Sequence, residues 1–400
     1  MKTLIHLVSE QTMQNLLPIL AFKPERVVQI RSRPPKFKAA AAHLRRAVEE
    51  ACTNPFYADL HPEFVEDVIE EDSPSVESTQ QCVSHHVKTA RHALVNITGG
   101  TKLMSLGASR AAEAYPDCLL IYCDTSQQQF VSLDGKPLPS SASFQEIAQR
   151  LTLKIVMAAH GVSSADWTFK TVDDQLLDIG RTGYAVFQKN RDAFQQFREK
   201  IRRHFRPSED RVPEGRKKLE ELCQTPIPVE PDVSEIRDFL EAAVCAGLLR
   251  RDTAGTYRPA LEPSRKRVEE LANILDGSWL ELYVLSLLKE NPNRWSDPHW
   301  SVQVRSAESV PIGETDLVCV EVPKCALHLI SCKTHVRQPL ETLESFTQRR
   351  RDMGGLFAKA TLAALDVRGN EVTKLRNWSL YLNVHLLIGN ELEKLRDDPH

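Results

Sequence analysis

Two glycines, two threonines and a lysine stand together in the segment NITGGTKLMS, residues 96–105. The apolar run ALVNIT leads into it and the helix-like run TKLMSLGASRAAEAY follows, a pattern typical of a strand that turns into a helix. Gly99 and Gly100 let the backbone approach a ligand, and Lys102 adds positive charge at a helix N-terminus, which itself attracts anions. The segment predicts a phosphate-binding turn, with a plain turn into a helix capped by a threonine as the alternative.

A second polar turn follows the first apolar run, TLIHLV, and consists of Ser9, Glu10, Gln11 and Thr12. In a parallel sheet with helices on both faces, ligands bind beyond the carboxyl ends of the strands. The ends of the first and fourth strands can lie side by side in such a sheet, so the two turns can share one ligand. If the domain pairs with a copy of itself, that ligand can have two-fold symmetry.

A carboxylate and a lysine stand in two strand-like runs of the C-terminal part, GETDLVCVEV and ALHLISCKT. Asp316 lies at the start of one run and Lys333 lies late in the next, so on paired strands the two side chains can converge. Glu281, in the otherwise apolar segment WLELYVL, is a third candidate because a buried carboxylate needs a partner. Carboxylates that hold Mg²⁺ or Mn²⁺ beside a lysine can hydrolyse a phosphodiester. The alternative for each residue alone is an ordinary solvated charge.

Regular elements must position these residues, and the first half of the chain alternates strand and helix patterns. Apolar runs predict five strands, and alanine-rich or amphipathic runs predict the helices between them. This βαβα order predicts the fold class α/β, with a parallel sheet covered by helices on both faces. The run FVSLDGKPL is expected to form a small hairpin around Asp134 and Gly135.

The rest of the chain divides into a middle region and a C-terminal domain. Residues 151–206 are expected to be mostly helical, and the segment PSEDRVPEGRKK then breaks the pattern. Residues 217–262 contain two helix patterns and the basic hairpin RRDTAGTYRP, which predicts a winged-helix-like module or a plain spacer. A long helical region and several strand patterns follow. We therefore expect domains at 1–206, 207–263 and 264–400.

The composition argues against several classes of protein. The formal net charge of −3 gives no global attraction to nucleic acid, so any such binding needs a local basic patch. Nine scattered cysteines without a CxxC pair argue against a disulfide framework or a zinc site. The N-terminus has too short an apolar core for a signal peptide, and no run is expected to span a bilayer. We expect a cytoplasmic protein without membrane contact.

The chain resembles the type III CRISPR effector nucleases, in which a CARF (CRISPR-associated Rossmann fold) domain precedes a PD-(D/E)XK nuclease domain. NITGGTKLMS matches the family's ligand loop, and LDGSWLELYV, GETDLV, ISCKT and RRRDMGG match the nuclease half. The resemblance implies a prokaryotic protein in which a cyclic oligoadenylate, commonly cyclic tetra-adenylate, binds across a homodimer and activates the nuclease allosterically. The ligand-binding residues that it implies are Ser9, Gln11, Thr12, Gly99, Gly100, Thr101, Lys102 and Ser105.

The catalytic residues that the resemblance implies are Glu281, Asp316 and Lys333, with Mn²⁺ or Mg²⁺ as cofactor. One departure is that the family's E-x-K motif reads Ser331-Cys332-Lys333 here, and a serine cannot supply the charge of a carboxylate to a hard cation. A glutamate of the following helix, Glu341 or Glu344, is expected to join the other two carboxylates at the metal. Otherwise the site is weak or inactive.

The expected function is cleavage of single-stranded DNA or RNA, with nicking of duplex DNA, in antiviral defence. Two alternatives stay open: a sensor with a weak or inactive nuclease site that regulates through DNA binding by its middle module, and a sensor that degrades its own cyclic ligand. We expect the two sites to be coupled through the middle region, including the helices at 184–205. Consecutive arginines at 349–351 point in different directions around a helix, and one or two are expected to contact phosphates.

Overall fold

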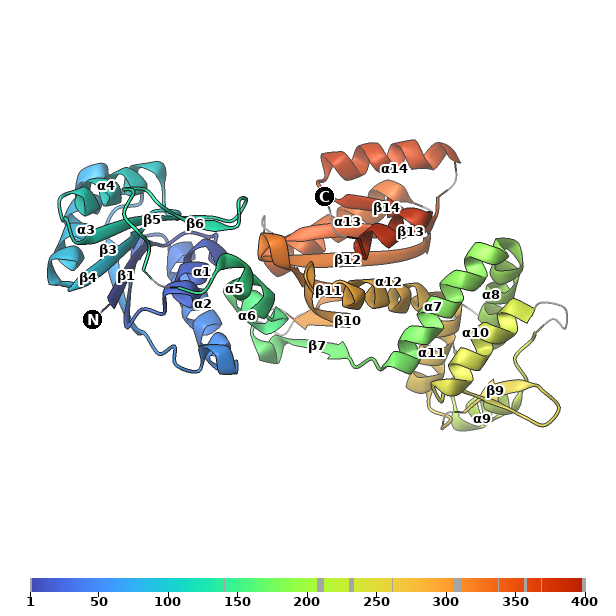
Figure 1. The fold of residues 1–400 in the computed structure, drawn as a ribbon. Helices are drawn as coiled ribbons and strands as arrows, with labels where there is room; N and C mark the ends of the chain where they lie inside the picture. Colours follow the sequence, from blue (N-terminus) through green and yellow to red (C-terminus); the bar gives the residue numbers. More distant parts are fainter. Residues whose placement is uncertain are drawn as a thin grey trace.

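The computed structural model describes residues 2–139, 141–206, 212–229, 234–260, 262–305, 311–336, 338–355, 358–367 and 369–397. Figure 1 shows three parts in a row. A sheet built from the N-terminal residues lies at one end, a sheet built mainly from the C-terminal residues lies in the middle, and a helical region lies at the other end. The second sheet therefore lies between the first sheet and the helical region.

The first sheet is formed by β1 (Lys2–Leu7), β2 (Arg26–Ser32), β3 (Glu63–Ile69), β4 (His92–Asn96), β5 (Cys118–Asp124) and β6 (Gln129–Ser132). The strand order is β3-β2-β1-β4-β5-β6, in which only β6 runs antiparallel to its neighbour. Its helices are α1 (Met13–Phe22), α2 (Pro35–Cys52), α3 (Val76–Thr89), α4 (Lys102–Glu113), α5 (Phe144–Arg150) and α6 (Leu153–Ala159). Helices α3 and α4 share one apolar cluster with the sheet, and α1, α2, α5 and α6 share another, so both faces are covered as predicted.

The second sheet is formed by β7 (Trp167–Lys170), β10 (Trp295–Arg305), β11 (Pro311–Glu321), β12 (Ala326–His335), β13 (Lys359–Asp366) and β14 (His385–Ile388). The strand order is β14-β13-β12-β11-β10-β7, with parallel pairing among β12, β13 and β14 and antiparallel pairing elsewhere. Its helices are α12 (Trp279–Glu290), α13 (Pro339–Gly354) and α14 (Gly369–Tyr381). The fold class α/β is therefore confirmed in both sheets.

The helical region is formed by α7 (Asp174–Lys189), α8 (Arg191–Phe205), α9 (Arg216–Gln224), α10 (Ser234–Cys245), the strand pair β8 (Leu249–Arg251) and β9 (Tyr257–Pro259), and α11 (Arg265–Asn273). A π-helical turn, η3 (Ile274–Ser278), joins α11 to α12. Short 3-10 turns lie at Pro55–Tyr57, Ser164–Asp166, Val322–Lys324 and Gly389–Leu395. The strand pair agrees with the expected hairpin of the middle segment.

The two sheets are packed together through α6 rather than separated by a linker. One apolar cluster contains Leu17 and Ile155 from the first part and Val318 and Leu329 from β11 and β12. The amide of Leu153 also donates to Asp297 Oδ2 at 2.8 Å. The two sheets are therefore joined by close packing.

Three expectations differ from the structure. The hairpin after β5 closes at residues 125–128 rather than at Asp134 and Gly135, because the Asp124 carboxylate accepts the amides of Ser126 and Gln127 and forms the turn there. The boundary expected at 206 does not follow the packing, since β7 pairs with the free edge of β10 and α7 packs against α12. The sequence predicts no run that could span a bilayer, yet the helical run Arg265–Glu290 is long and apolar enough to do so by length and composition. Within it, 78% of the most apolar stretch is buried inside the protein.

Candidate ligand cavity and nuclease centre

A cavity of about 830 Å³ opens where the carboxyl ends of β1 and β4 meet. The two strands pair directly, with Ile5 opposite Val95, so the two polar turns lie side by side as expected. Of the predicted ligand residues, six line the cavity: Ser9, Gln11, Thr12, Gly99, Gly100 and Thr101. Lys102 and Ser105, both in the described part of the chain, lie outside the lining. The hydroxyl of Ser105 instead donates to the carbonyls of Ile97 and Gly99, so it supports the turn.

The glycines are required first by the packing of the two turns. A Cβ atom on Gly99 would lie 2.2 Å from the carbonyl oxygen of Leu7, and Gly100 has a φ of +74°. Asn15 donates to the same Leu7 oxygen at 3.0 Å, which ties α1 to the end of β1. The Thr101 hydroxyl accepts the amide of Met104 and caps α4. The structure therefore shows a tight capped turn that borders a cavity, and phosphate binding by this turn stays a prediction.

Several lining residues are not among the predicted ligand-binding residues. Lys36 follows β2 at the same sheet edge, so the segment RPPKFK carries a local signal for it. His43 and His160 come from distant parts of the chain and have no local signal, and the arginine run 349–351 predicts a contact with nucleic-acid phosphates rather than a place in this cavity. Burial and the neighbouring His43 lower the pKa of His160 to about 4, so this ring is neutral at pH 7 and adds no positive charge to the cavity.

The predicted nuclease residues meet at the second sheet. Lys333 Nζ donates to Asp316 Oδ2 at 3.4 Å, because antiparallel pairing places Leu317 of β11 opposite Ile330 of β12. Glu281 approaches from α12, and its carboxylate accepts the indole N–H of Trp300 at 2.6 Å and the hydroxyl of Ser278 at 3.0 Å. The chain thus brings two carboxylates and one ammonium group together from three elements.

Ser331 occupies the position of the missing acid and acts as a hydrogen-bond donor. Its hydroxyl donates to Asp316 Oδ2 at 3.1 Å, and the amide of Cys332 donates to the same oxygen at 2.6 Å. Among the described contacts every donor to Asp316 goes to Oδ2, which leaves Oδ1 for a cation. Ser331 therefore orients the Asp316 carboxylate and does not replace the missing charge.

The charges of the centre fit a divalent metal ion. Burial and, to a lesser extent, the nearby Asp316 carboxylate raise the pKa of Glu281 to about 7, while the hydrogen bonds from Trp300 and Ser278 and the charge of Lys333 partly offset both effects. Two carboxylates that disfavour each other's ionisation are stabilised by a cation, and Mg²⁺ or Mn²⁺ takes oxygen ligands of this kind. Asp316 and Glu281 would hold the ion, which when bound polarises a phosphate and activates water.

Among the described residues, no hydrogen bond or ion pair joins Glu341 or Glu344 to this centre. Both are exposed on α13, whereas the face of that helix that packs on the sheet carries Leu343 and Phe346. No contact among the described residues joins either glutamate to Asp316. A site with two carboxylates remains compatible with Mg²⁺, which usually keeps several waters.

The raised pKa of Glu281 predicts a pH-dependent effect of metal. In the metal-free protein the folded state holds the Glu281 proton up to about pH 7, above the value of 4.5 for an exposed glutamate, so stability falls as pH rises between these values, by about 3 kcal/mol at most. A cation that binds the ionised pair offsets this loss. Thermal unfolding with and without Mn²⁺ should show a larger stabilisation at pH 8 than at pH 5.5. Glu281→Gln should abolish the difference, and an unchanged difference in that variant would contradict the assignment.

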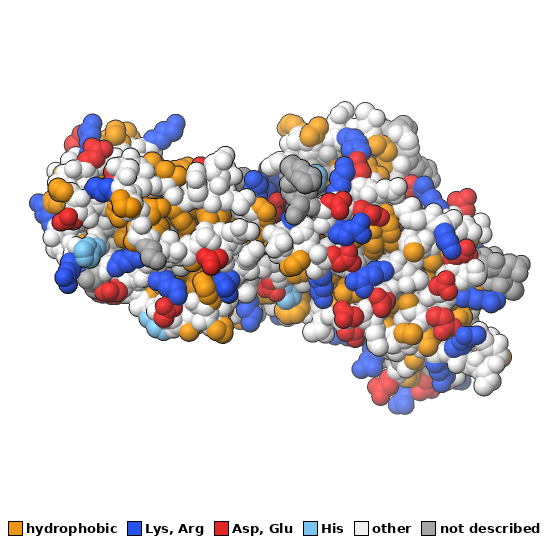
Figure 2. Space-filling model, in the orientation of Figure 1, with side chains coloured by type: hydrophobic (Ala, Val, Ile, Leu, Met, Phe, Trp, Pro, Cys, Tyr) orange, Lys and Arg blue, Asp and Glu red, His pale blue; other side chains and the backbone are white. Residues whose placement is uncertain are grey.

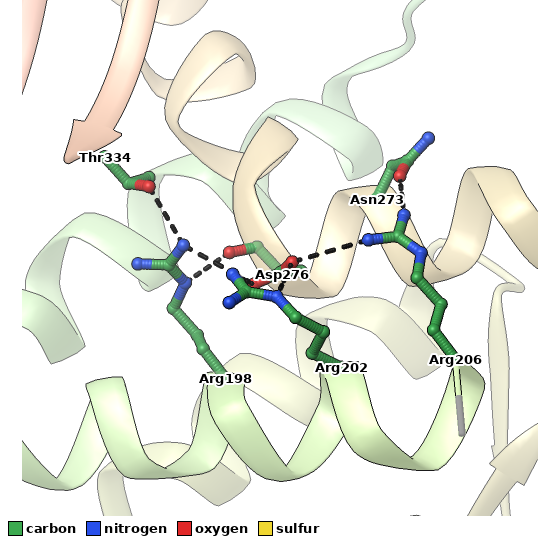
Figure 3. A network of polar contacts seen from close by, with 6 residues as sticks. All are labelled: Arg198, Arg202, Arg206, Asn273, Asp276 and Thr334. Carbon is green, nitrogen blue, oxygen red and sulfur yellow. Dashed lines mark hydrogen bonds and ion pairs between the residues drawn. The ribbon is translucent and has the colours of Figure 1, made fainter. Parts of the chain in front are cut away.

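A buried charge network lies next to the nuclease centre (Figure 3). Two arginines of α8 and Arg206, the residue that follows this helix, surround Asp276 of η3: Arg202 donates to both carboxylate oxygens at 3.0 Å, Arg206 lies 3.7 Å away, and Arg198 donates to the Asp276 backbone oxygen. Arg198 also donates to Thr334, the neighbour of Lys333, at 2.9 Å. Arg198 therefore links η3, which precedes the Glu281 helix, to β12, while Arg202 and Arg206 bind Asp276.

Comparisons with known families match both parts of the chain. The family model of the Card1 CARF domain matches residues 3–154, and that of the Card1-like endonuclease domain matches residues 268–398. The second match contains the whole acidic centre, and the first contains both polar turns. No curated protein matches the chain.

Solved structures share the fold over almost the whole length. Can2 from Sulfobacillus thermosulfidooxidans, in complex with cyclic tetra-adenylate, is 17% identical with a TM-score of 0.67, covering 98% of this chain and 95% of Can2. Protein VC1899 from Vibrio cholerae is 16% identical with a TM-score of 0.72, covering 99% and 96%. A type III CRISPR defence DNA nuclease activated by cyclic oligoadenylate is 16% identical with a TM-score of 0.52, covering 92% of this chain and 46% of that one.

Proposed function

Because the chain belongs to the type III CRISPR effector family, with a Card1 CARF domain followed by a Card1-like endonuclease domain, we propose that it is a metal-dependent nuclease activated by a cyclic oligoadenylate. The observation that carries the proposal is the acidic centre of Glu281, Asp316 and Lys333 inside the endonuclease domain. Asp316 and Glu281 hold Mn²⁺ or Mg²⁺, and Lys333 adds positive charge where negative charge develops on the phosphate.

The activator is proposed to be cyclic tetra-adenylate, bound by the cavity at the ends of β1 and β4. Can2 has the same fold and binds this ligand, which supports the choice. A ring with two-fold symmetry fits two copies of the cavity, so we propose a homodimer. Ser9, Gln11 and Thr12 of the first turn and Gly99 to Thr101 of the second contact the ring, while Lys102 and Ser105 stand behind them. The setting is antiviral defence in the prokaryotic cytoplasm.

The substrates are proposed to be single-stranded DNA and RNA, with nicking of duplex DNA. Nucleic acid is proposed to be held through its phosphates, because phosphate contacts position a strand without reading its sequence. On the face in Figure 2, charges of both signs are interspersed over the described side chains. The competing proposal is a DNA-binding regulator, and it relies on the basic hairpin of the middle segment. The hairpin's contacts give this proposal less support than the nuclease proposal has. Arg251 pairs with Glu241 and Arg258 pairs with Asp252, which neutralises much of that hairpin's charge.

The proposal is tested with labelled single-stranded DNA, single-stranded RNA and supercoiled plasmid in Mn²⁺. Each is incubated with no ligand or with cyclic tri-, tetra- or hexa-adenylate. Fragments that accumulate with one ring alone would identify the activator. Tight ring binding without cleavage of any substrate would favour the regulator, and linear adenylates recovered from the ring would favour the self-limiting sensor.

A further inference from the structure

Helix α13 connects the two sites. It begins at Pro339, shortly after the end of β12, the strand that contains Lys333. It ends at Gly354, which lines the ligand cavity. Its 16 residues span about 24 Å at the rise of an α-helix. The endonuclease domain therefore supplies part of the sensor cavity itself, through residues 351–355. The expected route through the helices at 184–205 is longer than this direct contact.

The three consecutive arginines of α13 have three different surroundings. Arg349 donates to the carbonyl of Glu314, two residues before Asp316 on β11. Arg350 is buried and donates to the carbonyl of Asn383 at 2.6 Å, which fixes the helix beside the end of α14. Arg351 is exposed and lines the cavity, and no hydrogen bond or ion pair with another described residue holds its guanidinium group.

The N-terminal part of the chain brings little positive charge to the cavity. Among the described lining residues from this part, the only lysine or arginine is Lys36, and Glu10 pairs with it at 2.9 Å. Arg351 is thus the cavity cation that no acid neutralises. A guanidinium group binds phosphate through paired, charge-assisted hydrogen bonds.

The end of α13 packs tightly against the second sheet, so a displacement of Arg351 would displace that sheet as well. A Cβ atom on Gly354 would lie 2.9 Å from Leu327 of β12 and 2.6 Å from Ala358, so the helix lies directly on the strand that carries Lys333. Arg349 ties the same turn to β11, which carries Asp316. Closely packed elements of this kind shift together.

We propose that Arg351 binds a phosphate of the cyclic ligand from the endonuclease side of the cavity, and that α13 carries this contact to β11 and β12. The inference rests on the proposed function, and it assigns the coupling between sensor and nuclease to one helix. A ligand shifts a conformational equilibrium only by its differential affinity for the two states. The Arg351 contact supplies that difference when it forms in the active arrangement.

The test measures cyclic tetra-adenylate binding by calorimetry in EDTA, and cleavage in Mn²⁺ over a ligand titration, on the full chain. Arg351→Ala is expected to weaken binding by about tenfold or more and to lower the cleavage rate at saturating ligand. Arg351→Glu should lose more, because it repels phosphate, and Arg351→Lys should recover part of both. Arg376→Ala, which removes an arginine of α14 paired with Glu391, is the matched control and should resemble the unchanged protein.

The outcomes separate the two proposals. Unchanged protein that binds none of the rings would overturn the proposed function. The role of Arg351 would be overturned by a different result. In that result the unsubstituted protein binds the ring and is activated, and Arg351→Ala binds the ring equally tightly and reaches the same cleavage rate. Arg351 is exposed, so thermal unfolding of each variant should match that of the unchanged protein, which shows that any loss is not caused by misfolding.

Discussion

Replacing Asp316 by Asn is expected to lower ligand-activated cleavage by about a thousandfold, because the amide cannot supply negative charge to the cation that polarises the phosphate. The side chain keeps its size and still accepts the amide of Cys332, so the sheet stays intact. Initial rates on labelled single-stranded DNA in Mn²⁺ with saturating ligand measure the effect. Ligand affinity should change little, since Asp316 does not line the cavity.

The matched control for this variant is Glu314→Gln, two residues earlier on β11. Glu314 is exposed, and its carboxylate accepts from the side chains of Ser301 and Gln303. Its rate is expected to stay within about twofold of the unchanged protein, as for most surface substitutions. Equal losses in the two variants would contradict the assignment of Asp316. The same assay on Glu341→Gln and Glu344→Gln decides whether either supplies a third carboxylate.

Asp276→Ala is expected to destabilise the fold by about 3 kcal/mol, because removing one partner of a buried ion pair leaves the other charges uncompensated. The guanidinium groups of Arg198, Arg202 and Arg206 point toward Asp276 in Figure 3, and burial already lowers the pKa of Arg198. Urea unfolding measures the change. Cleavage should fall as well, because the network fixes η3, which precedes the helix of Glu281, and Thr334, which follows Lys333.

Two further variants show whether the network accounts for this loss. Arg203→Ala removes an exposed arginine of the same helix and should leave stability within about 0.5 kcal/mol of the unchanged protein. Asp276→Asn keeps the shape but not the charge, and should fall between the two. An Asp276→Ala protein as stable as the Arg203→Ala protein would show that the ion pairs contribute nothing.

The elements with the clearest local patterns were predictable. Strands β1, β2, β4 and β5 are continuous apolar runs because helices cover both faces, and each was identified. Strand β13 was missed because its sequence, KATLAALD, is rich in alanine, which favours helices, and only its place between β12 and β14 makes it a strand. Strand β7 was missed for a similar reason, since four residues gain strand structure only from the free edge of β10.

The sites follow the same division. Asp316, Lys333 and Glu281 can be proposed from the sequence because their motifs are local, and the turns after β1 and β4 can be proposed because they follow apolar strands. Ser105 was assigned to the ligand because spacing alone does not tell a residue that lines a cavity from one that supports the turn behind it. The Asp276 network, and the entry of Arg351 into the cavity, depend on contacts between segments more than 70 residues apart, as the pair Arg202–Asp276 illustrates, and such contacts leave no periodic signal.

The central claim is that a cyclic oligoadenylate turns on metal-dependent cleavage at the Lys333 centre. The most direct measurement is the initial rate of single-stranded DNA and RNA cleavage in Mn²⁺, with and without cyclic tetra-adenylate, for the unchanged protein and for Lys333→Ala. We predict a rate that rises with the ligand in the unchanged protein and stays at background in the variant, while both bind the ligand equally. Ligand-dependent cleavage that persists in Lys333→Ala would contradict the account.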